Sequence, residues 1–197
     1  SIPIQNIDRI EITKGSGSVV YGDGATGGTI QIYTRDSTDT SIGFSLGNYG
    51  RQTATINTGF STKKFQFSAF GNNYKQDGYS DKGPDGNRDE GELLNSKVRI
   101  QYKPTESSKL FIEKKATYLE YRYPNLLSKS TFEQNPGSND KGAAGTPTAY
   151  THQIENTDVI ELGSTFKINK NIETNFDYSF VDQKRVISSE RKYKNHY

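Results

Sequence analysis

Long stretches of the chain alternate between apolar and polar residues with a period of two. After residue 40, Ile42, Phe44 and Leu46 are separated by glycine and serine, and Ile56 and Phe60 keep the same phase in the next stretch. Because successive side chains of a β-strand point to opposite faces of a sheet, the pattern predicts strands with one apolar and one polar face. The predicted strands cover residues 41–47, 53–60, 65–69, 96–103, 109–123, 160–168 and 172–180. The frame of 109–123 stays open, because both of its faces carry apolar residues.

The connections between these strands differ in length. They are short or tight at residues 48–50, 61–64, 104–108 and 169–171, and long and polar at residues 79–92 and 124–157. Short turns at one end and longer loops at the other are typical of a transmembrane β-barrel. A soluble antiparallel sandwich shows similar alternation, so the pattern leaves both folds open. In a barrel, the residues expected to face lipid include Ile42, Phe44, Ile56, Phe60, Phe67, Ile100, Phe166 and Phe176.

Composition favours a sheet that is wet on one face. Only 30% of the residues are hydrophobic and the mean hydropathy is −0.85, yet 12% are aromatic. Compact soluble domains are typically about 45–50% apolar, whereas disordered chains have few aromatic residues. A polar strand face that lines an interior accounts for both observations.

Net charge and residue usage exclude several classes of function and of structural feature. Lys and Arg number 25 against 23 Asp and Glu, a net charge of +2 that gives no case for nucleic acid binding. The absence of cysteine excludes disulfides and thiolate metal sites. No stretch approaches the roughly 18 apolar residues of a membrane helix. The chain starts at Ser1 without a methionine or a signal peptide, and we interpret it as an internal piece of a longer protein.

The first 35 residues have a different character from the rest. A strand is predicted over residues 7–14, with Ile10 and Ile12 on one face and Arg9 and Glu11 on the other, and Gly15 ends it. Residues 16–21 could form a helical turn capped by a serine at position 16 or 18. A glycine-rich corner then leads to a second strand over residues 29–34. Together these elements predict a small α+β unit.

The glycine corner, GDGATGG at residues 22–28, has the spacing of a dinucleotide-binding loop, G-x-G-x-x-G. That motif binds phosphate only when a helix opens from its last glycine, because the helix N-terminus supplies the unpaired N–H groups. Here the glycines lead directly into the alternating, β-branched stretch 29–34, which is a predicted strand. We therefore expect a structural role, in which the glycines allow positive φ and close packing of the backbone.

The stretch IDRIEITKG at residues 7–15, followed by VYGDGATGGTIQI at residues 20–32, resembles the end of the plug domain of TonB-dependent outer-membrane receptors. Lys14-Gly15-Ser16 departs from the family's usual Arg-Gly-Pro, although Lys14 keeps the positive charge. The residues that carry this motif are Arg9, Glu11, Lys14, Gly15, Tyr21, Gly22, Gly24, Gly27 and Gly28.

The resemblance implies an all-β fold with two parts. Residues 1–36 would be the C-terminal part of an α+β plug domain, and residues 37–197 the N-terminal strands of an antiparallel transmembrane β-barrel. About seven strands of a 22-stranded wall would be present. Such a fragment has two open edges, and open edges are prone to aggregate.

The resemblance also implies a function. Receptors of this family import a scarce ligand, most often an iron chelate such as a ferric siderophore or ferric citrate, using energy from the TonB complex. Contact with TonB would come from a region upstream of residue 1, and the barrel wall would contact outer-membrane lipid in a bacterial cell. The alternatives left open are a non-transporting barrel that acts as an adhesin or anchor, and a soluble all-β binding module.

The longest loop carries a second resemblance. Residues 123–136, YPNLLSKSTFEQNP, are similar to a loop of ferric-citrate-type receptors. The residues by themselves also fit an ordinary loop helix that ends before Pro136, with Ser130 and Glu133 forming a capping box. An anionic iron chelate would require basic contacts, for which the available residues are Arg122, Lys129 and Lys141.

Other candidate sites are less specific. Asp85, Asn87 and Asp89 have the spacing of the first three calcium ligands of an EF-hand loop. However, Glu90 replaces the glycine that the turn requires and position twelve is Ser96, so a solvated acidic loop is the alternative. The histidines, His152 and His196, are expected in loops without metal-ligand partners. No arrangement typical of a catalytic site occurs, and we expect neither an enzyme nor a cofactor.

Overall fold

The computed structural model describes residues 7–15, 27–34, 38–82, 88–124, 126–138, 150–189 and 191–196. The chain divides into two compact units, residues 1–37 and 38–197. Among the described residues, no helix is both long enough and apolar enough to span a membrane.

The first unit contains an antiparallel hairpin of β1 (Ile7–Lys14) and β2 (Gly28–Thr34). Both strands were predicted from their alternation, and the structure confirms them. Ile10 pairs with Ile32 and Ile12 with Ile30, so four isoleucines share one face of the hairpin. The predicted helical turn at residues 16–21 and the glycine corner up to residue 26 lie outside the described residues.

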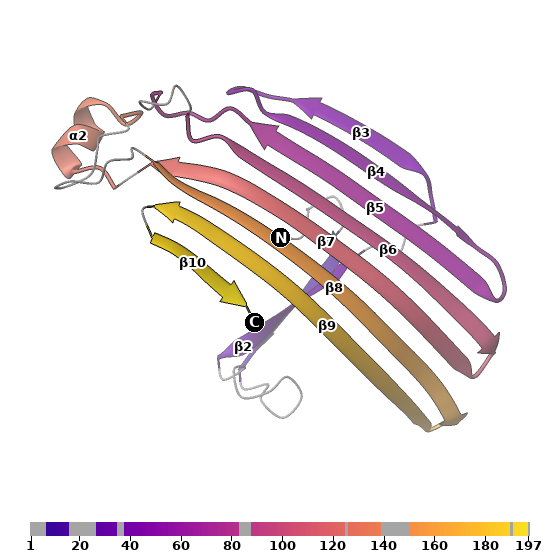
Figure 1. The fold of residues 1–197 in the computed structure, drawn as a ribbon. Helices are drawn as coiled ribbons and strands as arrows, with labels where there is room; N and C mark the ends of the chain where they lie inside the picture. The colour runs from indigo at the N-terminus through magenta and orange to yellow at the C-terminus, as the bar shows by residue number, and fades with distance from the viewer. Residues whose placement is uncertain are drawn as a thin grey trace. The chain divides into compact units, whose positions relative to one another are not determined.

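The second unit is one antiparallel sheet in which every strand pairs with its neighbours in the sequence (Figure 1). A short helix, α2 (Lys129–Gln134), lies in the connection between β7 and β8. The strands in order are β3 (Ser41–Leu46), β4 (Gln52–Ser61), β5 (Phe65–Gln76), β6 (Gly91–Thr105), β7 (Ser108–Pro124), β8 (Tyr150–Asn169), β9 (Ile172–Ser189) and β10 (Arg191–His196).

The sheet has eight strands, of which seven correspond to the predicted ones. The strand β10 was not predicted, and several strands are longer than expected. The loop expected up to residue 157 ends earlier, because β8 already begins at Tyr150. That part of β8 is rich in polar residues on both faces, which hides the period of two.

The strand connections alternate between two ends of the sheet, as predicted. The short-turn end carries residues 62–64, 106–107 and 170–171 between paired strands. The long-loop end carries the turn at residues 47–51 and the connections at residues 77–90 and 125–149. In Figure 1, α2 lies at the long-loop end, opposite the short turns.

The two faces of the sheet have opposite chemistry. One row of directly paired residues on the apolar face runs across six strands, through Phe60, Phe67, Ile100, Ile112, Leu162 and Tyr178. The adjacent row on the polar face runs through Gly59, Ser68, Arg99, Glu113, Glu161 and Ser179. This register settles the frame of β7: Leu110 and Ile112 belong to the apolar face, and Phe111 and Glu113 to the polar face.

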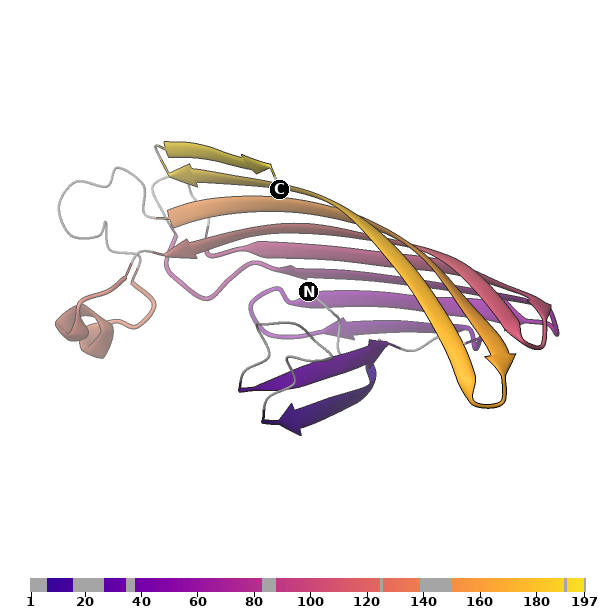
Figure 2. The same cartoon turned by 90° about the horizontal axis from the view of Figure 1, so that it is seen from below.

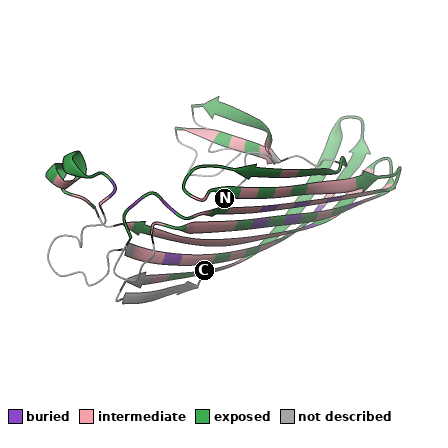
Figure 3. Ribbon diagram, turned by 90° about the horizontal axis from the view of Figure 1, so that it is seen from above, coloured by how far each residue is buried: buried purple, intermediate pink, exposed green. Residues whose placement is uncertain are grey.

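The sheet lacks a conventional hydrophobic core. Phe70 is the one hydrophobic residue buried among the described residues, whereas Ser68, Asn72 and Lys97 are buried on the same polar face. Most buried positions lie in the middle strands, and the edge strand β3 is largely exposed (Figure 3). The sheet is strongly curved (Figure 2), and side chains crowd on its polar face while those on the apolar face stay open to the surroundings.

The apolar stretches shift along the strands from one edge of the sheet to the other. Phe44 on β3 lies in register with Tyr118 of β7, through the intervening strands. On β9, Tyr178 lies in register with Ile112 of β7. The centre of the apolar stretch therefore moves toward the short-turn end by six residues, from the level of residue 118 to that of residue 112, between β3 and β9.

Candidate functional site

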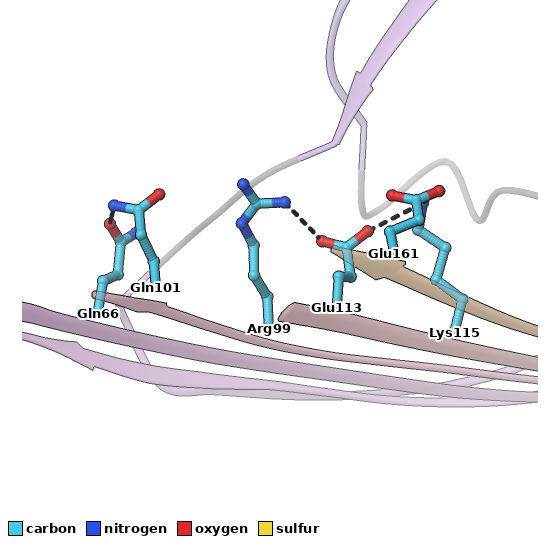
Figure 4. A network of polar contacts seen from close by, with 6 residues as sticks. All are labelled: Gln66, Arg99, Gln101, Glu113, Lys115 and Glu161. Atoms are coloured by element: carbon cyan, nitrogen blue, oxygen red, sulfur yellow. Dashed lines mark hydrogen bonds and ion pairs between the residues drawn. The ribbon is translucent and has the colours of Figure 1, made fainter. Parts of the chain in front are cut away.

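A ladder of alternating charges crosses the polar face from β6 to β8 (Figure 4). Arg99 Nη1 lies 3.1 Å from one carboxylate oxygen of Glu113, and Lys115 Nζ lies 2.9 Å from the other. The same lysine Nζ is 2.9 Å from Glu161 Oε1 on the next strand. Glu113 is only 4% exposed, so its charge is compensated by two cations in place of water.

An aromatic ring supports the arginine of this ladder. Arg99 Cζ lies 3.8 Å from the centroid of the Phe111 ring, in a cation–π arrangement. Phe111 pairs directly with Gly163 of β8, and a Cβ at Gly163 would lie only 2.1 Å from the ring. The ring therefore covers the glycine backbone, and the missing side chain is what makes room for it.

Further polar pairs extend the same face toward the long-loop end. Thr117 donates a hydrogen bond to Asn95 Oδ1 at 3.0 Å. Glu155 accepts hydrogen bonds from Gln183 and Arg185, both at 2.8 Å. The whole face can offer hydrogen bonds and charges of both signs to a polar occupant. Within the described residues, no three His, Cys, Asp or Glu side chains are placed to hold a metal ion.

At the long-loop end, the β3–β4 turn is attached to the β5–β6 connection. The N–H of Asp77 donates to the carbonyl of Tyr49 at 2.9 Å, and the rings of Tyr49 and Tyr79 meet edge-to-face at 5.4 Å. Tyr49 has φ +60° and is followed by Gly50 at φ +66°, the geometry of a type I′ hairpin turn. Only glycine and asparagine adopt this conformation readily, so a tyrosine here is strained.

A second attachment joins the β5–β6 and β7–β8 connections. The N–H of Asp81 donates to the Gly137 carbonyl at 2.7 Å, and Asn135 Nδ2 donates to the Asp81 carboxylate at 3.0 Å. Asp81 thereby fixes the chain just beyond α2 to the β5–β6 connection.

The calcium candidates are only partly described. Asp85 and Asn87 lie outside the described residues. The Oδ1 of Asp89 accepts hydrogen bonds from the backbone N–H of Ser80 at 2.6 Å and from its hydroxyl at 2.7 Å. Asp89 thus contributes to the internal structure of the loop.

The loop helix was predicted correctly, but its cap was not. The structure places α2 at Lys129–Gln134, before Pro136 as expected. Its N-cap is Ser128, whose Oγ accepts a hydrogen bond from Thr131 N at 3.1 Å, so the assignment of Ser130 as the cap was wrong. The helix begins two residues earlier because the extended backbone of Ser128 aims its hydroxyl at that N–H.

The candidate basic contacts differ in accessibility. Arg122 is 17% exposed and its Nη1 lies 3.8 Å from Glu90, whereas the Lys129 side chain is 88% exposed and lies 3.8 Å from Glu133. Lys141 is outside the described residues.

The expectation that both histidines lie in loops was wrong. His152 is on β8, with its Nε2 at 2.7 Å from Glu120 Oε1, and His196 is on β10. The strand predicted here began only at residue 160 and β10 was not predicted, so both histidines were assigned to loops.

In the first unit, the predicted motif residues form a compact contact group. Arg9 donates to Glu11 at 2.8 Å and lies over the ring of Tyr33, 3.7 Å from its centroid. The hydrogen bond from Arg9, and a second one from the Tyr33 hydroxyl, lower the pKa of the Glu11 carboxyl. Tyr33 was not singled out in the sequence, although its phase in β2 places it opposite Arg9.

The glycines of the motif are described in part. Gly15 has φ +101° and Gly28 has φ +142°, where a Cβ would lie 2.5 Å from the Thr13 carbonyl oxygen. Lys14 pairs with Gly28 in the hairpin, and the N–H of Gly15 donates to the Gly27 carbonyl at 3.4 Å. Tyr21, Gly22 and Gly24 lie outside the described residues.

The charge ladder itself was not predicted from the sequence. Arg99 and Glu161 lie on the polar faces of predicted strands, but they meet only through Glu113 and Lys115 of β7. The open frame of residues 109–123 concealed that link. If the frame of β7 had been known, the opposite charges on the polar faces of three successive strands would have indicated the ladder.

Comparisons with known proteins by sequence and by structure point to the same kind of protein. A family model described as "TonB-dependent Receptor Plug Domain" matches residues 1–29. The siderophore receptor PiuA from Acinetobacter baumannii has a similar structure, with a TM-score of 0.68, 13% identity, and coverage of 92% of this chain and 27% of that chain. A structure described as copper transporter OprC matches with a TM-score of 0.51, 15% identity, and coverage of 99% of this chain and 38% of that chain.

This chain thus spans about a quarter to two fifths of those two proteins. The family consists of receptors and transporters and not of enzymes. Residues 1–29 therefore match a TonB-dependent receptor plug domain, and the sheet that follows has the fold of part of a TonB-dependent receptor barrel of the bacterial outer membrane.

Proposed function

We propose that this chain is part of a receptor that imports a scarce ligand across the outer membrane with energy from the TonB complex, and that the ligand is an iron chelate of the ferric siderophore or ferric citrate type. The observation that supports it most is the order of the two parts, a plug segment followed directly by a sheet with one apolar and one polar face. A barrel that serves as an adhesin or anchor requires no plug, and a soluble module requires no apolar outer face.

In this proposal, the apolar face contacts outer-membrane lipid and the polar face lines the interior. The plug ends near residue 36 and the barrel begins at residue 37, close to the division of the chain into its two compact units. Contact with TonB comes from a region upstream of residue 1. The charge ladder on the polar face belongs to the inner wall, where water and charged groups are accommodated.

The charge of the long-loop end suggests where an anionic chelate is met. The β5–β6 connection with the start of β6 carries five carboxylates at described positions, against Lys82 and Arg88. An anionic ligand is repelled there, so we place its contact on the β7–β8 connection, where Lys129 is highly exposed. PiuA is described as a siderophore receptor and OprC as a copper transporter, so both ligand classes are included in the test.

The ligand class is tested by uptake of radioactive iron as ferric citrate and as ferric siderophores in cells that produce the full-length receptor. A second receptor has residues 126–149 replaced by a short glycine–serine linker, which joins the end of β7 to the start of β8. We expect iron uptake by the intact receptor and a loss of affinity in the loop variant. Copper uptake without iron uptake would contradict the iron assignment, and unchanged affinity of the loop variant would contradict the ligand site.

The energy source is tested separately, in cells with and without TonB. Import by the proposed mechanism requires TonB, whereas binding to the cell surface does not. Equal accumulation of ligand inside both strains would contradict the transport mechanism and leave a passive barrel.

A further inference from the structure

The first residues of the β5–β6 connection have no regular secondary structure, yet they are held in place from several sides. The N–H of Asp77 donates to the Tyr49 carbonyl, and the carboxylate of Asp89 accepts from both the N–H and the hydroxyl of Ser80. Arg88 Nη1 donates to the Ser80 carbonyl at 2.6 Å. Ser80 is only 3% exposed, and its polar groups are paired within the protein. This segment is therefore a firm support at the long-loop end of the sheet.

On the β7–β8 connection, Asn135 joins α2 to a tight turn. Its N–H donates to the Thr131 carbonyl at 2.8 Å and closes the helix, and its own carbonyl accepts from the N–H of Ser138 at 3.0 Å. Its Oδ1 accepts from the N–H of Gly137 at 3.2 Å. Pro136, with its fixed φ, follows Asn135 in this turn. Because the end of the helix and the turn meet in one residue, the position of Asn135 fixes the position of α2.

Asp81 connects this turn to the support. Asn135 Nδ2 donates to Asp81 Oδ2 at 3.0 Å, and the N–H of Asp81 donates to the Gly137 carbonyl at 2.7 Å. Gly137 is buried, and Tyr79 Cε1 lies 3.9 Å from the place that a Cβ of Gly137 would occupy. We call the two hydrogen bonds between Asp81 and residues 135–137 the Asp81 clip.

The Asp81 clip takes no part in the pairing of the strands. β7 and β8 stay in register up to the pair of Pro124 and Tyr150, where the connection between them begins and ends. The wall is thus complete without the clip, and the clip acts on the connection alone. A fixed point inside a long connection limits how far the residues before it can move. It therefore determines where α2 lies beyond the strand ends (Figure 1).

The helix held in this way carries the exposed cation of the connection, Lys129, which is the first residue of α2. We propose that Asp81 is a positioning residue for the ligand site on the β7–β8 connection. It holds α2 in one place, so that an incoming anionic chelate meets Lys129 in a defined position. When a binding-competent position is only partly populated, the apparent affinity falls by the populated fraction. This inference rests on the proposed function, which places the ligand on this connection.

The test exchanges the two partners of the clip in the full-length receptor. Asn135→Asp places two carboxylates opposite each other and breaks the contact. D81N/N135D restores one donor and one acceptor with their roles reversed, and the exchanged carboxylate can still accept from the N–H of Gly137. Gln134→Glu is the matched control, because it adds the same charge at the neighbouring position, the last residue of α2.

The position of α2 is measured in the absence of any ligand. Spin labels are attached to cysteines introduced by Glu133→Cys on α2 and Gln52→Cys at the start of β4, and their separation is measured by double electron–electron resonance. We expect one narrow distance distribution for the native background, for Q134E and for D81N/N135D. In the N135D background the distribution should be broad, because α2 is no longer held.

Uptake of radioactive iron, supplied as ferric citrate and as a ferric catecholate, is then measured with the unlabelled receptors. We expect N135D to raise the KM by about fivefold while the maximal rate stays the same, because the lost hydrogen bonds leave only a fraction of the loops in place. D81N/N135D and Q134E should transport as the native receptor does. A change in the maximal rate alone would indicate damage to the transporter, and would contradict a positioning role.

A narrow distribution in the N135D background, or a broad one in the D81N/N135D background, would overturn the clip. A broad distribution in N135D with an unchanged KM would overturn the positioning role. Failure of the proposed function is distinguishable from both outcomes. A receptor that keeps its affinity after replacement of residues 126–149 would contradict the ligand site, whereas the distance measurement requires no ligand and still decides whether the clip holds α2.

Discussion

At the scale of single residues, Glu113 is the centre of the polar face. Its carboxylate is almost fully covered and contacts Arg99 on one side and Lys115 on the other. Arg99 lies on β6, Glu113 and Lys115 lie on β7, and Lys115 also contacts Glu161 of β8, so the ladder links three strands through three ion pairs. Such a group is costly to remove because the charges that it compensates remain in place.

Replacement of Glu113 by alanine is expected to lower the free energy of unfolding of the full-length receptor by about 2 kcal/mol. The measurement is urea-induced unfolding in micelles, monitored by the far-UV circular dichroism of the β-sheet. Glu133→Ala on the exposed surface of α2 is the matched control, since its side chain is 63% exposed. Equal stability of the Glu113→Ala and Glu133→Ala proteins would contradict the role of the ladder.

A second residue-scale prediction concerns Gly163. A methyl group there would overlap the Phe111 ring and would also lie 2.5 Å from Asp177 Oδ1. We expect Gly163→Ala to cost about 1–3 kcal/mol, because the ring and the arginine stacked on it must both move. Gly91→Ala is the control, since its added Cβ would meet neighbours only at 3.6 Å and beyond. The comparison uses the same unfolding measurement, and a smaller cost at Gly163 than at Gly91 would be inconsistent with this packing.

The sequence predicted these faces better than it predicted their contacts. The period of two assigned Arg99, Glu161 and the apolar residues to the correct sides of their strands. It did not predict that Arg99 and Glu161 are linked, because that depends on the register of β7. Register depends on turn length and on both neighbouring strands, and a single strand with apolar residues on both faces contains too little information to fix it.

At the scale of elements, the long-loop end is a set of connections attached to one another. Asp77 joins the first turn to the second connection, and Asp81 joins the second connection to the chain after α2. None of these contacts could be predicted from the sequence, since residues 49 and 77, like residues 81 and 135, are far apart in the chain and no periodicity links loops. In contrast, the helix itself was predictable from its local capping and proline signals.

The position of the helix cap provides an element-scale test. Ser128→Ala removes the hydroxyl that accepts from Thr131 N and should destabilise α2 by about 1 kcal/mol. Amide hydrogen exchange of residues 129–134 in the full-length receptor should then be faster by about fivefold. Ser130→Ala is the control, because that residue lies inside the helix. Faster exchange in the Ser130→Ala protein than in the Ser128→Ala protein would contradict the observed cap.

At the scale of the whole molecule, the sheet is a wall with two free edges. Within the described sheet, β3 pairs only with β4, and β10 pairs only with β9. The pattern of hydrophobic residues predicted this wall and its two faces. The relation of the wall to the plug segment was not accessible from periodicity, and the plug was identified by its own local motif.

The two faces predict which positions react with a water-soluble reagent when the receptor is in a membrane. Cysteines placed at Phe44 and Ile56 should react slowly with a water-soluble maleimide in intact outer membranes, because lipid covers the apolar face. Cysteines at the adjacent positions, Ser45 and Asn57, point to the other face and serve as controls. The same comparison can be extended to Phe60, Phe67, Ile100, Phe166 and Phe176. Fast labelling at most of the apolar positions would contradict the barrel assignment.

The shift of the apolar stretches along the sheet has a geometric consequence. Six residues of shift over the six steps from β3 to β9 correspond to one residue per strand. With about 3.3 Å per residue and about 4.8 Å between strands, the strands incline by about 35° to the membrane normal. A strand at this inclination crosses an apolar band about 25 Å tall in about nine residues. The short turns advance in the same direction, because β6 continues past the level of Lys64 to Thr105 and β8 past the level of Ser107 to Asn169. Successive turns thus end at a similar depth. The three short turns are therefore spread along the chain but share one level of the membrane.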